Sequence, residues 1–119
     1  MRYSLIALKG IKKTFGLFEA LKGINLEFST GKFATIVGRN GAGKSTLLKI
    51  MAGLMAPSVG EITINGSTFK NGSGMHREDM GVVAHQACIY PSLSAYANLL
   101  FYGKLFSVKE LKNRVKEVL

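Results

Sequence analysis

A glycine-rich segment in the first half of the chain has the residue types and spacing of a phosphate-binding loop. Residues 38–45 read Gly-Arg-Asn-Gly-Ala-Gly-Lys-Ser and match the pattern G-x-x-x-x-G-K-[ST] at every fixed position. Glycines permit backbone conformations that bring amide N–H groups close to phosphate oxygens. In this pattern Lys44 is expected to reach the β- and γ-phosphates of ATP, and Ser45 to place its hydroxyl on Mg²⁺. Thr46 adds a hydroxyl near the α-phosphate.

The elements that flank this loop are those that the motif requires. The apolar run at residues 33–37 predicts a strand covered on both faces. Residues 44–52 predict a helix with apolar side chains around most of its circumference, so the helix is expected to be largely buried, and Gly53 is expected to end it. A helix that begins at the loop directs the positive end of its dipole at the phosphates. The predicted nucleotide-binding residues here are Gly38, Asn40, Gly41, Ala42, Gly43, Lys44, Ser45 and Thr46.

Periodicity and turn signals predict the remaining elements. Short strands are expected at residues 5–8, 24–28, 62–64 and 80–83, with a hairpin turn at Asn65-Gly66. Ser94 is expected to cap a helix over residues 95–106. Ser107 and Glu110 are expected to form the capping box of a last helix. The apolar face of that helix carries Leu111, Val115, Val118 and Leu119.

Composition narrows the class of protein. The 119 residues fit one small globular domain, with 47% hydrophobic residues. The net charge is +9, but the basic residues are scattered, so no nucleic-acid partner is expected. One cysteine, Cys88, excludes an intramolecular disulfide. Residues 80–103 carry no formal charge when His85 is neutral, but Pro91 would break a membrane-spanning helix near its middle.

The loop continues into a longer pattern that is typical of one family. After Ser45 the sequence reads Thr-Leu-Leu-Lys-Ile-Met-Ala-Gly-Leu, and residues 57–62 read Pro-Ser-Val-Gly-Glu-Ile. Over essentially the whole chain it resembles the ATP-binding subunits of ABC transporters. The resemblance implies an α/β fold, with a P-loop NTPase (RecA-like) core, an antiparallel β-subdomain and the start of a helical subdomain. It assigns the β-subdomain and core, through the Q-loop, to residues 1–93, and the helical subdomain to residues 94–119.

The resemblance also suggests two site residues outside the loop. Phe15 stands where the family has an aromatic ring that stacks on adenine, although Phe18 is close enough that Phe15 could instead be a core residue. Gln86 stands in the Q-loop position, where a glutamine reaches Mg²⁺ and the attacking water; the alternative is an ordinary loop amide. Lys44 and Gln86 are thus the expected catalytic residues, and Ser45 and Gln86 the expected Mg²⁺ ligands. His85 before Gln86 is similar to the haem-export subunits of cytochrome c maturation systems.

Other parts of the family's hydrolytic machinery do not match this sequence. The family has an aspartate–glutamate pair after a second strand, an L-S-G-G-Q signature and a switch histidine, all beyond the Q-loop. The single aspartate, Asp79, precedes Gln86 and follows charged residues, so it is expected to be a solvated charge. We therefore expect a partial, truncated domain that binds Mg·ATP weakly and does not hydrolyse it alone.

The resemblance also implies partners for the full-length parent. These are a membrane permease subunit and a second ATP-binding domain arranged head to tail, on the cytoplasmic, inner face of the cell membrane. ATP hydrolysis would then drive transport. Two other functions stay open: a nucleotide-binding module that acts by association without hydrolysis, and an ABC-family protein that acts on ribosomes or DNA.

Overall fold

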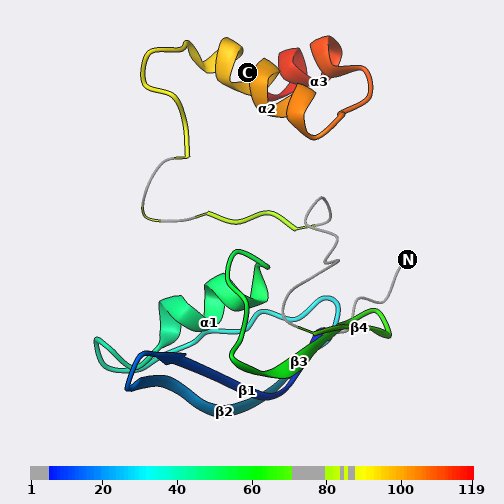
Figure 1. Cartoon of the computed structure of the whole chain (residues 1–119). Helices are drawn as coiled ribbons and strands as arrows, with labels where there is room; N and C mark the ends of the chain where they lie inside the picture. Colours follow the sequence, from blue (N-terminus) through cyan, green and yellow to red (C-terminus); the bar gives the residue numbers. More distant parts are fainter. Residues whose placement is uncertain (1–5, 71–79, 84, 86–87) are drawn as a thin grey trace. The chain divides into compact units, whose positions relative to one another are not determined.

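The computed structural model describes residues 6–70, 80–83, 85 and 88–119. The chain divides into two compact units, Met1–Met80 and Gly81–Leu119. Strands and helix α1 make up the first unit, and helices α2 and α3 the second (Figure 1). None of the helices in the described ranges combines the length and the apolar character that a membrane span needs. The boundary at residues 93 and 94 stays a prediction.

The first unit is built on a four-stranded antiparallel sheet with the order β2-β1-β3-β4. β1 (Ile6–Phe15) and β2 (Phe18–Phe28) form a long hairpin. β3 (Val59–Ile64) pairs with β1, and β4 (Ser67–Lys70) forms a second hairpin with β3. The antiparallel sheet expected from the resemblance is therefore confirmed.

The first two strands are longer than the sequence predicted. β1 continues to Phe15, and β2 already begins at Phe18. The pairing of β1 shifts its register between Leu8 and Ile11, and both of these side chains are buried. Such an irregularity interrupts the period of two by which a strand is recognised in a sequence. Backbone pairing with β2 nevertheless continues across it.

The hairpin turn predicted between β3 and β4 is confirmed. Asn65 has φ 51° and Gly66 has φ 81°. A type I′ turn requires left-handed φ at both central residues, and Asn-Gly is its preferred pair. The turn matches the twist of the two strands and fixes their register.

Helix α1 (Lys44–Met51) packs over one face of this sheet (Figure 1). The core contains side chains from β1, β2, α1 and β3, namely Leu8, Ile11, Leu21, Leu47, Ile50 and Ile62. Burying each of them contributes about 2 kcal/mol of transfer free energy. The prediction that α1 is buried on most sides is wrong, because only one face meets the sheet and Leu48 remains 54% exposed. Gly53, at φ 66°, ends the helix as predicted.

Two predicted strands are not formed in the described part of the chain. Residues 33–37 and 80–83 are not hydrogen-bonded into a sheet. Phe33 is fully exposed and Val37 is 84% exposed, whereas Ile36 packs partly against the core. An extended apolar segment becomes a strand only where a neighbouring strand accepts its hydrogen bonds. Among the described residues, neither segment has such a partner.

The second unit consists of α2 (Ala95–Leu105) and α3 (Leu111–Val118). Ser94 caps α2 as predicted, since its side chain accepts a hydrogen bond from the Ala97 amide at 3.1 Å. The predicted capping box is wrong. Ser107 has φ 53° and, with the bond from the Val108 amide to the Gly103 carbonyl, ends α2 in a Schellman motif. It therefore cannot cap α3, whose N-cap is Glu110 without a side-chain bond.

A buried asparagine fastens the segment before α2 to that helix. Asn98 is 5% exposed. Its Oδ1 accepts from the Tyr90 amide at 2.8 Å, and its Nδ2 donates to the carbonyls of Tyr90, Leu93 and Ser94 at 3.1 Å each. Both N–H groups of Nδ2 and one acceptor site of Oδ1 thus hold the backbone of residues 90–94.

Replacing Asn98 by alanine is expected to lower the free energy of unfolding of this unit by about 2 kcal/mol, because buried backbone groups lose their partners. Chemical denaturation followed by circular dichroism measures the change. Asn113, exposed on α3, provides the control, and Asn113→Ala should stay within about 0.5 kcal/mol of the original chain. Equal stabilities of the two variants would show that the Asn98 bonds contribute little.

Candidate functional site

The glycine-rich loop leads into α1 and is shaped by a turn. The Ala42 amide donates to the Arg39 carbonyl at 3.1 Å. Gly41 and Gly43 have φ 82° and 91°, in the left-handed region that glycine adopts without steric cost. The loop curls back on itself at these residues before the helix starts at Lys44.

The last glycine of the loop also packs directly against the sheet. A Cβ atom at Gly43 would lie 2.6 Å from the Ala20 carbonyl oxygen and 2.8 Å from Cδ2 of Leu21, both in β2. Only a residue without a side chain permits this approach. Gly43 therefore sets how closely the loop and the start of α1 rest on β2.

The beginning of α1 presents backbone amides suited to an anion. Gly43 is the N-cap residue and supplies no side-chain cap, and the first bond of the helix runs from the Leu47 amide to the Gly43 carbonyl at 2.9 Å. The amides of Lys44, Ser45 and Thr46 thus have no acceptor within the helix. With no acidic residue in the first turn, the positive end of the helix dipole is left for a ligand.

The side chain of Lys44 folds back over the loop. Its Nζ donates to the carbonyls of Gly38 and Arg39 at 2.7 Å each. These two bonds hold the ammonium group beside the loop amides, so the loop concentrates positive charge at one place. A compact ammonium with three donors can exchange one carbonyl for a phosphate oxygen without moving far.

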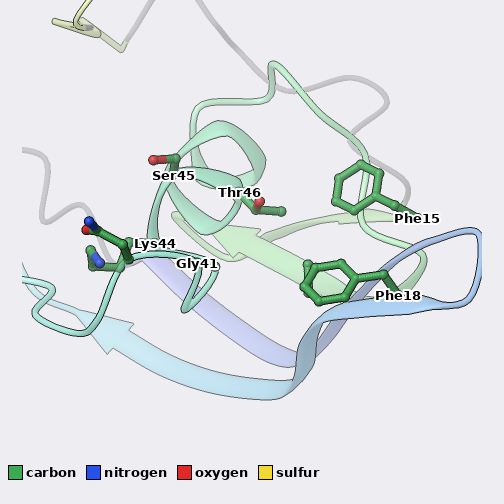
Figure 2. A pocket seen from close by; sticks show the side chains of 9 residues that line it. Phe15, Phe18, Gly41, Lys44, Ser45 and Thr46 are labelled. Carbon is green, nitrogen blue, oxygen red and sulfur yellow. The ribbon is translucent and has the colours of Figure 1, made fainter.

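An open pocket of about 460 Å³ joins the loop to the tip of the β1–β2 hairpin (Figure 2). Its volume lies in the range of small-molecule sites. The lining residues are Phe15, Phe18, Ala20, Asn40, Gly41, Gly43, Lys44, Ser45 and Thr46. Two aromatic rings and the positive end of α1 therefore face the same space, which suits a ligand with a flat ring and an anionic tail.

Phe18 and Ala20 line the pocket although neither was predicted from the sequence as a site residue, and Phe18 is the larger of the two. Phe15 and Phe18 are direct cross-strand partners across the two-residue connection Gly16-Leu17. Side chains of directly opposed residues project from the same face of a hairpin. The spacing Phe-Gly-x-Phe in the sequence could have indicated this pairing, because a glycine between two strands favours a tight turn. Gly16 has φ 58° in the structure, as such a turn requires. Phe15 is 46% exposed and Phe18 is 61% exposed, so neither ring is a core residue.

Comparison with known proteins identifies the family. The sequence model described as "ABC transporter" matches residues 21–119, most of the chain. The chain belongs to the ABC transporter family. The match covers the loop, α1 and both helices of the second unit.

Individual ABC proteins are similar to the chain over most of its length. The Linearmycin resistance ATP-binding protein LnrL of Bacillus subtilis (strain 168) is 33% identical over 117 residues, which are 97% of this chain and 38% of LnrL. The Fe(3+) ions import ATP-binding protein FbpC of Mesorhizobium japonicum is 38% identical over 101 residues, which are 82% of this chain and 28% of FbpC. The chain thus spans well under half the length of these curated relatives.

A solved ABC cassette has the same fold. The ATP-binding cassette MJ0796, in a dimeric post-hydrolysis state bound to ADP and Pi, superposes with a TM-score of 0.76 at 30% identity. The superposition covers 94% of this chain and 54% of MJ0796. The predicted fold class, a P-loop NTPase cassette with an antiparallel β-subdomain, is therefore confirmed.

The remaining predicted residues of this ABC domain are placed as follows. The Gly38 carbonyl accepts a hydrogen bond from Lys44, and the Ala42 amide donates to the Arg39 carbonyl. Both residues belong to the loop, but neither lines the pocket. Gln86 and Asp79 lie outside the described residues. His85 and Cys88 are exposed. No cluster of three or more metal-ligating side chains occurs among the residues that the structure describes.

Proposed function

We propose that this chain is the nucleotide-binding part of the ATP-binding subunit of an ABC transporter and that it binds Mg·ATP in the pocket between Phe15 and the loop. The observation that carries this proposal is the common pocket, because it unites an aromatic surface with the amides and ammonium group at the start of α1. The polar groups suit a triphosphate, and a phenyl ring offers the face on which adenine stacks. Phe18 provides a second ring at the same place.

In the proposed complex the loop holds the phosphates through backbone and side chain together. The amides of Lys44, Ser45 and Thr46, which have no acceptor within the helix, donate to phosphate oxygens, and Thr46 adds its hydroxyl near the α-phosphate. Lys44 gives up a bond to the Gly38 or Arg39 carbonyl and donates to the β- and γ-phosphates instead. The two carbonyls keep its ammonium in place before a ligand arrives, so little rotamer entropy is lost on binding.

The residues also fit the Mg²⁺ ion that accompanies ATP. Mg²⁺ keeps several waters and takes one or two protein ligands besides phosphate oxygens, so the single hydroxyl of Ser45 in the pocket suffices. When bound, Mg²⁺ neutralises negative charge on the phosphates. Gln86 is proposed as a second Mg²⁺ ligand that also contacts the attacking water.

Activity and partners are proposed for the whole protein. Because the chain spans only part of its relatives, we propose hydrolysis in the full-length subunit and nucleotide binding without turnover by these 119 residues. MJ0796 is described as dimeric, and FbpC as an import ATP-binding protein. We propose that the full-length protein likewise pairs with a second cassette and docks on a membrane permease, at the inner face of the cell membrane. LnrL is named for linearmycin resistance and FbpC for the import of Fe(3+) ions, so the proposal concerns the motor and not a cargo.

Isothermal titration calorimetry with ATP, with and without Mg²⁺, tests this proposal. The original chain should bind ATP, and Mg²⁺ should tighten binding. Ser45→Ala should bind metal-free ATP as tightly as the original chain does. The increase in ATP affinity on adding Mg²⁺ should be about tenfold smaller, because one hydroxyl ligand of the ion is lost. Ser92→Ala, at an exposed position in the second unit, is the control. Absence of ATP binding by the original chain would refute the proposed function.

A further inference from the structure

The hairpin that carries Phe15 is tied to the segment that follows the loop helix. The Ser58 amide donates to the Lys12 carbonyl at 2.8 Å, and the Thr14 amide donates to the Ser58 hydroxyl oxygen at 3.1 Å. The hydroxyls of Thr14 and Ser58 are also within hydrogen-bond distance of each other, at 3.2 Å. The end of β1 thus has a fixed position relative to the chain leaving α1.

Lys13 adds a bond of a different kind to this connection. Its Nζ donates to the Ala56 carbonyl at 2.8 Å and lies 5.3 Å from the centroid of the Phe15 ring. At that distance an ammonium group is attracted by the negative face of a phenyl ring. Lys13 therefore fastens the Phe15 side chain, through the Ala56 carbonyl, to the same segment that Ser58 holds.

Of Lys13 and Phe15, only Phe15 lines the pocket. The ammonium group is already engaged by a carbonyl and a ring, so it is placed to act on a ligand through Phe15. A ring that is held beforehand loses less freedom when a base stacks on it, and this raises affinity for the base without a new contact to the ligand.

We propose that Lys13 is a positioning residue for the nucleotide base: it holds the Phe15 ring in the orientation that stacks on adenine, and so determines how much the base adds to binding. This inference rests on the proposed function, because it requires that ATP occupies the pocket. It goes further in assigning to a lysine outside the pocket a role that concerns the base and not the phosphates.

The role predicts different effects on two ligands that share the same phosphates. In calorimetric titrations of the full 119-residue chain, Lys13→Met should weaken binding of ATP about fivefold, the size of one exposed cation–π contact. Binding of inorganic triphosphate should change less than twofold. Lys13→Arg should restore ATP affinity, because a guanidinium group keeps both the hydrogen-bond donor and the cation.

The matched control is Lys12→Met, which removes the same charge from the neighbouring position on β1, where the side chain is exposed. It should affect ATP and triphosphate alike and only slightly. Equal weakening of ATP and triphosphate by Lys13→Met, or unchanged ATP affinity, would overturn the role of Lys13 while leaving the nucleotide site in place. If the original chain bound triphosphate but not ATP, or neither ligand, the proposed function would fail, and this inference with it.

Discussion

Lys44→Ala is expected to weaken binding of Mg·ATP about 100-fold. The ammonium group of Lys44 is held by two carbonyls of the loop, each at 2.7 Å, beside the amides that begin α1. In the proposed complex it forms charge-assisted bonds to two phosphates, and the loss of such bonds costs about 3 kcal/mol in total, which corresponds to this factor. Calorimetric titration of the original and variant chains with Mg·ATP measures it.

The control for this variant is Lys49→Ala. Lys49 lies in the last turn of the same helix, is exposed, and is far along the helix from the loop. Its removal changes the net charge by the same amount, so it should alter affinity less than twofold. If Lys44→Ala bound Mg·ATP as tightly as Lys49→Ala, the loop would not be the phosphate site.

Gly43→Ala is expected to lower the free energy of unfolding of the first unit by about 3 kcal/mol. The new methyl group would lie 2.6 Å from the Ala20 carbonyl oxygen, so the start of α1 would have to move away from β2. Overpacking of this kind costs about 1–3 kcal/mol, and a side chain at φ 91° adds about 1 kcal/mol. Urea denaturation measures the loss, and nucleotide binding should fall with it.

Gly41→Ala separates the two causes. Gly41 has φ 82°, but a Cβ atom there would meet nothing within 4 Å. This variant should therefore show the backbone cost alone, about 1 kcal/mol. Equal destabilisation by both variants would mean that the close contact between Gly43 and β2 can relax without lowering the free energy of unfolding.

Local features of the fold could be predicted from the sequence where they depend on a few neighbouring residues. The left-handed pair Asn65-Gly66 sets its own turn, and Ser94 caps α2 with its own hydroxyl. The ends of α1 follow in the same way from Gly43 and Gly53. In each case the conformational preference of the residue itself decides the geometry.

Features that depend on another element of the fold could not be predicted in this way. Residues 33–37 have the composition of a buried strand, but the described residues provide no neighbouring strand to accept their hydrogen bonds. Ser107 and Glu110 have the spacing of a capping box, yet Ser107 ends α2 because its backbone bonds complete that helix first. Within the described ranges the first pattern lacks the partner strand that it requires, and the second loses Ser107 to the end of the preceding helix.

The residues of the site show the same difference between local and tertiary control. By itself the sequence determined the family and the phosphate-binding loop, because the glycines, Lys44 and Ser45 are adjacent in the chain and their spacing carries the chemistry. Only the tertiary structure placed Phe18 with Phe15 in the pocket, and Lys13 between the Phe15 ring and Ala56. The contacts of Lys13 and Thr14 join β1 to residues more than forty positions away, and the pocket brings the two rings to a loop more than twenty positions away, so the packing of the sheet with α1 and its flanking loops decided them.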